Sequence, residues 1–186
     1  LPMAKREALI VDYGLGNLFN TQGACEASGV RVEISDNPSE IAKAKRLIIP
    51  GVGAFVDGMK GLHERKLIKP IQDFAKSGKP VLGICLGMQL MLKESEEWGH
   101  HEGLALVDGR VMRLRDPLPM AAQFKIPHIG WNAMKAVSTS PILKNVADKK
   151  SAEYFMYFLH SYFPVVKNEQ AVIATTEYRR DAFCSA

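Results

Sequence analysis

Short apolar runs alternate with amphipathic stretches in the first hundred residues. Apolar strands are predicted at 7–12, 30–34, 46–50 and 79–84. Helices are predicted at 17–28, after the turn at 35–39, at 66–76 and from Cys85 onward through CLGMQLMLKE. Strands that alternate with helices in this way form a parallel, doubly wound sheet.

After Gly99 the segments are shorter and rich in aromatic and β-branched residues. They are VMRL at 111–114, IPHIGWNAM at 126–134, YFMYFLHSYFPV at 154–165 and QAVIATTEY at 170–178. This composition favours a mixed or antiparallel extension of the sheet. We find no internal repeat and no low-complexity linker. The prediction is therefore one α/β domain over residues 1–186, with a change of sheet character near residue 100.

Composition narrows the class of protein. The 47% hydrophobic residues suit a globular domain, and the net charge of +4 comes from scattered side chains without the charge runs of a nucleic-acid surface. Cys25, Cys85 and Cys184 lack the spacing of a disulfide framework or a zinc site, which favours a reducing cytoplasm and no bound metal. No apolar run approaches about 18 residues, so we expect neither secretion nor a membrane span.

Gly83, Cys85 and Gly87 form a G-x-C-x-G motif where a strand runs into a helix. This is the thiol form of a nucleophile elbow, in which flanking glycines leave room for a tight turn. Helix amides that face the sulfur are expected to lower its pKa and to donate to an oxyanion. A lone cysteine is more often a small core residue, but the motif and its context favour a nucleophile.

The loop Pro50–Gly53 follows the preceding strand. At the carboxyl edge of a parallel sheet it should lie beside Cys85, where its amides would complete an oxyanion hole. Gly14 and Gly16 follow the first strand, but Phe19 stands where a dinucleotide fingerprint has its third glycine. No dinucleotide or other cofactor is predicted.

A thiol nucleophile normally requires a base. His63, His100 and His101 lie in polar stretches, whereas His128 and His160 lie in apolar, strand-like surroundings. For these last two we expect hydrogen-bonded core histidines. No histidine is assigned as the base.

Six segments together resemble the class I glutamine amidotransferases, and within them the glutaminase subunits of imidazole glycerol phosphate synthases. They follow the family order: DYGLGN at 12–17, PGVGAF at 50–55, GICLGMQLM at 83–91, SEE at 95–97, PHIGWN at 127–132 and FLHSYF at 158–163. The resemblance implies a flavodoxin-like three-layer sandwich with a mostly parallel central sheet and a smaller mixed or antiparallel extension.

The same resemblance implies that Cys85 attacks the side-chain amide of L-glutamine, giving a thioester and ammonia and then glutamate. It places the amides of Gly51, Val52, Gly53 and Leu86 around the oxyanion. Gln89 and Glu97 would contact glutamine, and Ser161 and Tyr162 would line the pocket near its α-substituents. From their positions alone, Glu97 suits a helix surface and Tyr162 a protein core.

The partner implied by the resemblance is a (β/α)8-barrel synthase, bound as a heterodimer, which receives the ammonia and makes imidazole glycerol phosphate and aminoimidazole carboxamide ribotide in histidine biosynthesis. Tyr13, Asn17 and Trp131 would lie toward it. The family's base and orienting acid come from a C-terminal H-P-E motif, which does not occur here. We therefore expect a domain that lacks its C-terminal end and shows little glutaminase turnover.

Three alternatives remain open from the sequence. The chain could be the glutaminase of another class I system, an elbow-cysteine hydrolase, peptidase or thiol-stress protein of similar architecture, or a noncatalytic subunit that binds the synthase.

Overall fold

The fold is that of a computed structural model, which describes residues 7–115, 125–144, 153–179 and 181–186. These residues gather into two compact units. Unit 1 comprises residues 1–95 and 100–107, and unit 2 comprises residues 96–99 and 108–186. The predicted change of character near residue 100 coincides with this division, whereas the prediction of a single domain stays a prediction.

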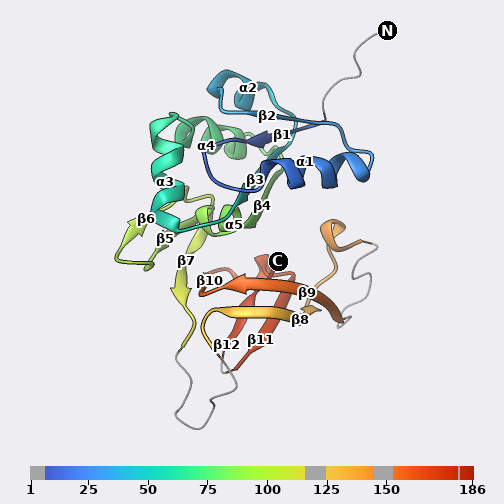
Figure 1. The fold of residues 1–186 in the computed structure, drawn as a ribbon, viewed down its shortest axis with the longest axis vertical. Coiled ribbons are helices and arrows are strands. Elements are labelled where there is room, and N and C mark those ends of the chain that lie inside the picture. The colour runs from blue at the N-terminus through green and yellow to red at the C-terminus, as the bar shows by residue number, and fades with distance from the viewer. Residues whose placement is uncertain (1–6, 116–124, 145–152, 180) are drawn as a thin grey trace. The chain divides into compact units, whose positions relative to one another are not determined.

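Unit 1 is built on a parallel sheet with strand order β2-β1-β3-β4 (Figure 1). Its elements are β1 (Ala8–Val11), α1 (Leu18–Ala27), β2 (Val32–Ser35), α2 (Pro38–Lys43), β3 (Leu47–Gly51), α3 (Phe55–Glu64), α4 (Ile68–Lys76), β4 (Val81–Cys85), α5 (Leu86–Leu90), β5 (Leu92–Ser95) and β6 (His101–Glu102). This is the flavodoxin-like strand order, so the predicted fold class is confirmed for this unit.

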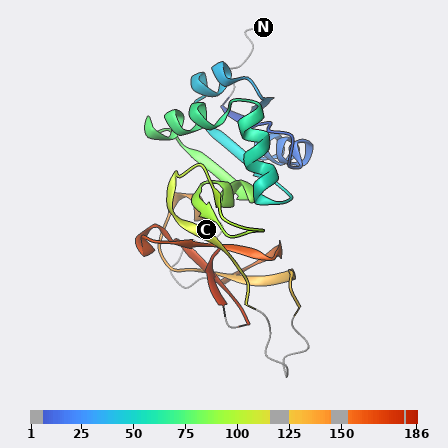
Figure 2. The same cartoon turned by 90° about the vertical axis from the view of Figure 1, so that its left-hand side faces the viewer.

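Helices cover both faces of the parallel sheet. Every residue of β1 and β3 is buried, as expected for central strands with no solvent-facing side. On one face Ala8, Ile10 and Ile48 pack against Leu18 and Cys25 of α1. Figures 1 and 2 show α1 in dark blue and α3 in teal on opposite sides of these strands.

Two helical segments differ from the prediction. The helix predicted through Glu94 ends at Leu90, because the Leu90 carbonyl accepts from the Leu104 amide and the chain continues as β5, paired with β6. The helix α3 was not predicted. Its glycines at 58 and 61 weaken the helical signal, but they allow close packing: a side chain at Gly61 would meet the carbonyl oxygen of Tyr13.

Unit 2 consists mainly of antiparallel strands. Its elements are β7 (Val107–Arg113, whose first residue is assigned to unit 1), β8 (His128–Ala136), the 3-10 turn η1 (Pro141–Leu143), β9 (Glu153–His160), β10 (Tyr162–Val166), the 3-10 turn η2 (Glu169–Ala171), β11 (Ala174–Tyr178) and β12 (Asp181–Cys184). One sheet has the order β12-β11-β8-β9, and β10 pairs antiparallel with β7. The predicted antiparallel character of this half is confirmed, but among the described residues its strands form sheets of their own and do not extend the parallel sheet.

The apolar segment YFMYFLHSYFPV forms two strands and not one. β9 ends at His160, and β10 begins at Tyr162 and pairs with β7 in place of β8. Ser161 therefore lies at the point where the chain passes from one sheet to another. Leu114, Phe163 and Phe183 form a buried cluster beneath this transition.

Among the described residues, no helix has the length and apolar character that crossing a membrane requires.

Candidate active site

Cys85 occupies a strained turn between β4 and α5. It is the last residue of the strand and the cap of the helix, with φ 54° and ψ −117°, in a region that L-residues rarely adopt. A Cβ atom at Gly83 would lie 2.6 Å from the Cα of Met88, and one at Gly87 would collide with the carbonyl oxygen of Ile49. The predicted steric reason for G-x-C-x-G is confirmed.

The glycine-rich loop lies beside this turn. Gly51 is the Cα partner of Cys85 in the parallel β3–β4 ladder. Gly51 is buried, whereas Val52 and Gly53 are exposed and Gly53 has φ 111°. The predicted adjacency of the two segments is thus confirmed. That the amides of Gly51, Val52, Gly53 and Leu86 bind an oxyanion stays a prediction.

Tyr13 supports the loop from the protein interior. Its side chain is 1% exposed, and its hydroxyl donates to the carbonyl oxygen of Pro50 at 2.6 Å. Burial raises the pKa of the Tyr13 hydroxyl, and the nearby Cys85 thiolate raises it further, so the phenol stays a donor. Tyr13 was predicted to face the partner, but its side chain is buried in the interior of this chain.

The thiol of Cys85 has a pKa above that of an ordinary cysteine. The residue as a whole is exposed, but protein atoms crowd its sulfur, and the resulting desolvation raises the thiol pKa. A hydrogen bond from the Leu86 amide lowers the pKa, as predicted, but this effect is the smaller of the two. The expectation of a lowered pKa was therefore wrong, because burial of the sulfur outweighs the helix amide.

The four residues predicted to contact glutamine fall in both units. Gln89 lies on α5 of unit 1, four residues after Cys85, which caps this helix. Glu97, Ser161 and Tyr162 belong to unit 2, and all four side chains are half-buried. Their contacts with a substrate stay predictions.

Two histidines form a hydrogen-bonded pair in unit 2. Nδ1 of His128 lies 2.9 Å from Nε2 of His160, and Nδ1 of His160 lies 3.0 Å from the carbonyl oxygen of Tyr162. Desolvation lowers the pKa of both imidazoles. The prediction of hydrogen-bonded core histidines is confirmed for His128, which is 3% exposed, whereas His160 is hydrogen-bonded but only half-buried. Because both nitrogens of His160 are engaged, neither is available to accept a thiol proton.

Among the predicted interface residues, Asn17 and Trp131 are exposed. Asn17 caps α1 by accepting a hydrogen bond from the Asn20 amide. Trp131 is 71% exposed and meets Tyr157 edge to face across the β8–β9 ladder. Sequence reasoning missed Tyr157, although its place in an alternating strand segment was a usable signal.

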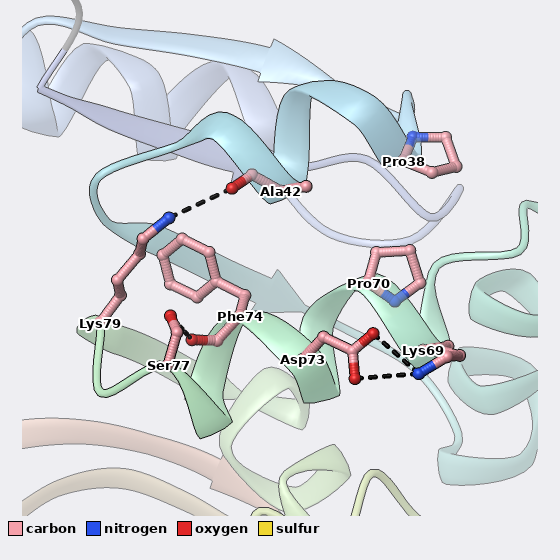
Figure 3. A pocket seen from close by; sticks show the side chains of 8 residues that line it. All are labelled: Pro38, Ala42, Lys69, Pro70, Asp73, Phe74, Ser77 and Lys79. Atoms are coloured by element: carbon pink, nitrogen blue, oxygen red, sulfur yellow. Dashed lines mark hydrogen bonds and ion pairs between the residues drawn. The ribbon is translucent and has the colours of Figure 1, made fainter.

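A cavity of about 410 Å³ between α2 and α4 lies away from this chemistry (Figure 3). Lys79 at its rim donates to the carbonyl oxygens of Ala42 and Ala44 and lies over the ring of Phe74, while Lys69 pairs with Asp73. The cavity adjoins the residues that precede β4, at the opposite end of the strand from Cys85. Ligands of parallel sheets bind at the carboxyl ends.

Within the described ranges, no cluster of three potential metal ligands occurs.

Comparison with known proteins identifies the family of this chain. The family model for "Glutamine amidotransferase class-I" matches residues 9–183. The imidazole glycerol phosphate synthase subunit HisH of Syntrophotalea carbinolica is 41% identical over 96% of this chain and 84% of its own length. The HisH subunits of Bacillus licheniformis and Rhodopirellula baltica are 44% and 45% identical, over 91% and 95% of this chain and 77% and 82% of their own lengths.

Solved structures support the same fold. The structure of PurLQS from Thermotoga maritima matches with a TM-score of 0.66 and 17% identity, over 94% of this chain and 76% of that one. A glutamine amidotransferase structure matches with a TM-score of 0.65 and 14% identity, over 94% and 86%. The chain therefore belongs to the class-I glutamine amidotransferase family, in the branch of the imidazole glycerol phosphate synthase subunit HisH.

Proposed function

We propose that the chain is the glutaminase subunit of an imidazole glycerol phosphate synthase that works in histidine biosynthesis. The thiolate of Cys85 attacks the side-chain amide carbon of glutamine, which forms a carbon–sulfur bond. The carbon–nitrogen bond breaks, and the nitrogen leaves as ammonia after it takes up a proton. Water then hydrolyses the thioester, which releases glutamate and restores the thiol.

The observation that carries this proposal is the strained backbone of Cys85 beside Gly51. A non-glycine residue with φ 54° and ψ −117° lies outside the regions that L-residues favour, and such strain concentrates at functional sites. The amide of Leu86 already donates to the sulfur. Backbone amides of the 51–53 loop and of Leu86 would stabilise the negative oxygen that develops during attack.

We propose that Gln89 and Glu97 contact the glutamine substrate, and that Ser161 and Tyr162 lie near its α-substituents. This assignment rests on their positions in the family motifs and on their half-buried side chains. No cofactor or metal takes part in the proposed steps.

We also propose a (β/α)8-barrel synthase as partner in a heterodimer, to which the ammonia passes through a protected channel. Support comes from the exposed face of the β8–β9 ladder, called here the aromatic face, which consists of Ile129, Trp131, Phe155, Tyr157 and Leu159, each 56–71% exposed. Contiguous exposed apolar residues mark interaction surfaces, and Trp and Tyr are frequent hot spots. The free cysteines agree with a cytoplasmic location.

Alkylation by a glutamine-like chloroketone tests the nucleophile. We expect peptide mass spectrometry to find the adduct on Cys85 and not on Cys25 or Cys184, which serve as internal controls. The Cys85→Ala variant should give no adduct. Equal modification of all three cysteines would contradict the proposal.

A binding measurement with the barrel synthase tests the aromatic face. Trp131→Ala and Tyr157→Ala should each weaken association by about tenfold or more, because buried aromatic anchors dominate interfaces. Ile142→Ala is the matched control, since Ile142 is also 56% exposed but lies on η1, outside the face. Unchanged affinity in both aromatic variants would exclude this surface as the docking site.

A further inference from the structure

A chain of hydrogen bonds leads from β8 to the start of β10 within unit 2. Nδ2 of Asn132 lies 3.3 Å from Nε2 of His128. Nδ1 of His128 lies 2.9 Å from Nε2 of His160, whose Nδ1 lies 3.0 Å from the carbonyl oxygen of Tyr162. The two histidines are also Cα partners in the β8–β9 ladder, so backbone pairing fixes their approach.

The carbonyl oxygen of Tyr162 determines which group donates at each step of this hydrogen-bond chain. A carbonyl oxygen can only accept, so Nδ1 of His160 carries the proton. In a neutral imidazole Nε2 of His160 is then an acceptor, and Nδ1 of His128 must donate to it. By the same reasoning Nε2 of His128 accepts from the amide of Asn132.

The contacts of Asn132 fix the same direction from the other end. Its Nδ2 donates to the carbonyl oxygen of Glu177 at 2.9 Å, and its Oδ1 accepts from the amide of Ala133 at 2.8 Å. These two contacts orient the side-chain amide so that its nitrogen faces His128. Both ends therefore require neutral histidines with the proton on Nδ1.

The hydrogen-bond chain ends where β9 passes into β10. The carbonyl oxygen of Ser161 accepts from the amide of Leu114 at 2.9 Å, and the next carbonyl oxygen, that of Tyr162, accepts from His160. Consecutive peptide units at Ser161 and Tyr162 are thus held by two different elements. Of these two contacts, only the second depends on a side chain.

We propose that Asn132, His128 and His160 are positioning residues, whose one-way hydrogen-bond chain holds the Ser161–Tyr162 segment in the conformation that receives the amino acid portion of glutamine. This inference rests on the proposed function, because it takes Ser161 and Tyr162 as part of the glutamine pocket. It adds the side chains that fix their backbone.

Aromatic rings pack against both histidines of the hydrogen-bond chain and favour their neutral forms. The ring of His128 stacks on Tyr178 at 3.8 Å and on Phe158 at 5.0 Å between centroids, and His160 meets Phe183 edge to face at 4.9 Å. Protonation of either imidazole would set two N–H groups against each other at one link of the chain. Desolvation, which lowers the pKa of both histidines, acts in the same direction.

Two charged side chains near the histidine pair make contacts elsewhere: those of Arg179 and Asp181. Arg179, which follows β11, lies over the ring of Tyr178, and Asp181 of β12 pairs with Arg115. Among the described residues, the rings of Tyr178, Phe158 and Phe183 and the side-chain amide of Asn132 contact the histidine pair.

Two substitutions at His160 separate positioning from simple structural support. In His160→Asn the amide nitrogen can take the place of Nδ1 and keep the donation to Tyr162. In His160→Gln the amide lies at the place of Nε2, so the contact with His128 can form but the donation to Tyr162 is lost. The two variants are of similar size and polarity, and their melting temperatures are compared first.

The readout is the rate of Cys85 alkylation by two reagents. For a glutamine-like chloroketone, His160→Gln should raise the concentration for half-maximal rate by about fivefold to tenfold, as expected for one lost hydrogen bond, while His160→Asn stays within about threefold of the original protein. Iodoacetamide has no α-substituents and should alkylate Cys85 at similar rates in all three proteins.

Three outcomes would overturn the inference. In the first, His160→Gln and the original protein need the same chloroketone concentration for half-maximal alkylation of Cys85. In the second, the Asn and Gln variants are impaired to the same extent. In the third, a variant reacts more slowly with both the chloroketone and iodoacetamide, by the same factor. If the original protein shows no saturable reaction with the chloroketone, the proposed function fails, and the positioning role falls with it.

The chemical shifts of the imidazole nitrogens test the hydrogen-bond chain without any substitution. Nuclear magnetic resonance of the ¹⁵N-labelled protein at neutral pH should find both His128 and His160 with the proton on Nδ1, the less common form of free histidine. A proton on Nε2 of either residue would break the chain and overturn the inference, even if the variants did not fold.

Discussion

Gly51 and Cys85 are Cα partners in the parallel ladder between β3 and β4, and the phenol of Tyr13 lies against the same glycine. A Cβ atom at position 51 would collide with the Tyr13 hydroxyl and lie 2.8 Å from the Cβ of Leu86. The glycine therefore lets the loop and the elbow approach each other. This contact connects the two motifs that the sequence places 32 residues apart at Gly51 and Gly83.

Gly51→Ala should destabilise the protein and slow alkylation of Cys85. Overpacking of this kind costs about 1–3 kcal/mol, which urea denaturation would detect. Gly23→Ala is the control, because a Cβ atom there meets nothing within 4 Å and Gly23 lies in the interior of α1. The control should be neutral or more stable by about 0.5–1 kcal/mol. Equal effects at both positions would refute the steric role of Gly51.

Tyr13→Phe should loosen the loop without emptying the core. The variant keeps the ring but removes the hydrogen bond to Pro50, at a cost of about 1 kcal/mol. We expect slower reaction of Cys85 with the glutamine-like chloroketone, measured beside urea denaturation. Tyr157→Phe removes a hydroxyl from a 58% exposed tyrosine and should change neither quantity. An unaltered rate in Tyr13→Phe would show that the loop does not depend on this contact.

Alkylation of Cys85 should continue to accelerate with pH beyond the range in which a small free thiol has reached its plateau. The cause is burial of the sulfur, which raises the thiol pKa and outweighs the amide of Leu86. Because the thiolate is the reactive form, the rate follows its fraction. The measurement is the iodoacetamide rate at Cys85 as a function of pH, with glutathione as the reference. A plateau below that of glutathione would contradict the expectation.

Mild acid should destabilise unit 2 through His128. Desolvation and the neighbouring His160 lower the pKa of His128 to about 4, from an ordinary value near 6.5. Between these two pH values the unfolded chain binds a proton that the folded chain does not, so stability is retained above about pH 6.5 and falls as the pH drops toward about 4.

Urea denaturation at several pH values measures this loss of stability in acid for the original protein and for His128→Asn. The variant keeps a donor at the place of Nδ1 but cannot be protonated, so its stability should depend less on pH over this range. Asp181 and Arg179 are common to both proteins, and the difference between them therefore isolates His128. Identical pH profiles would exclude His128 as the source.

Hydrophobic periodicity was sufficient to predict the four strands of the parallel sheet. Strands such as β1 and β3 are short, wholly apolar and bounded by turns, which is a pattern with few alternatives. The G-x-C-x-G motif likewise placed Cys85 correctly, because its glycines are required locally, by the turn itself.

Long-range contacts explain what the sequence did not predict. The helix α3 contains glycines that lie close to Tyr13 and Leu90, and α5 ends where the returning amide of Leu104 donates to the carbonyl oxygen of Leu90. The burial of Tyr13 and the link from His160 to Tyr162 follow from the partners that the fold brings to them. No local pattern encodes such partners.

The most direct test of the central claim is protection of Cys85 by the substrate. The rate of Cys85 alkylation by the glutamine-like chloroketone is measured with increasing glutamine, and in parallel with asparagine and with glutamate. We predict that glutamine slows the reaction in a saturable way, and that the other two amino acids have little effect at the same concentrations. Equal protection by all three, or none by glutamine, would contradict the assignment of Cys85 as a glutamine-specific nucleophile.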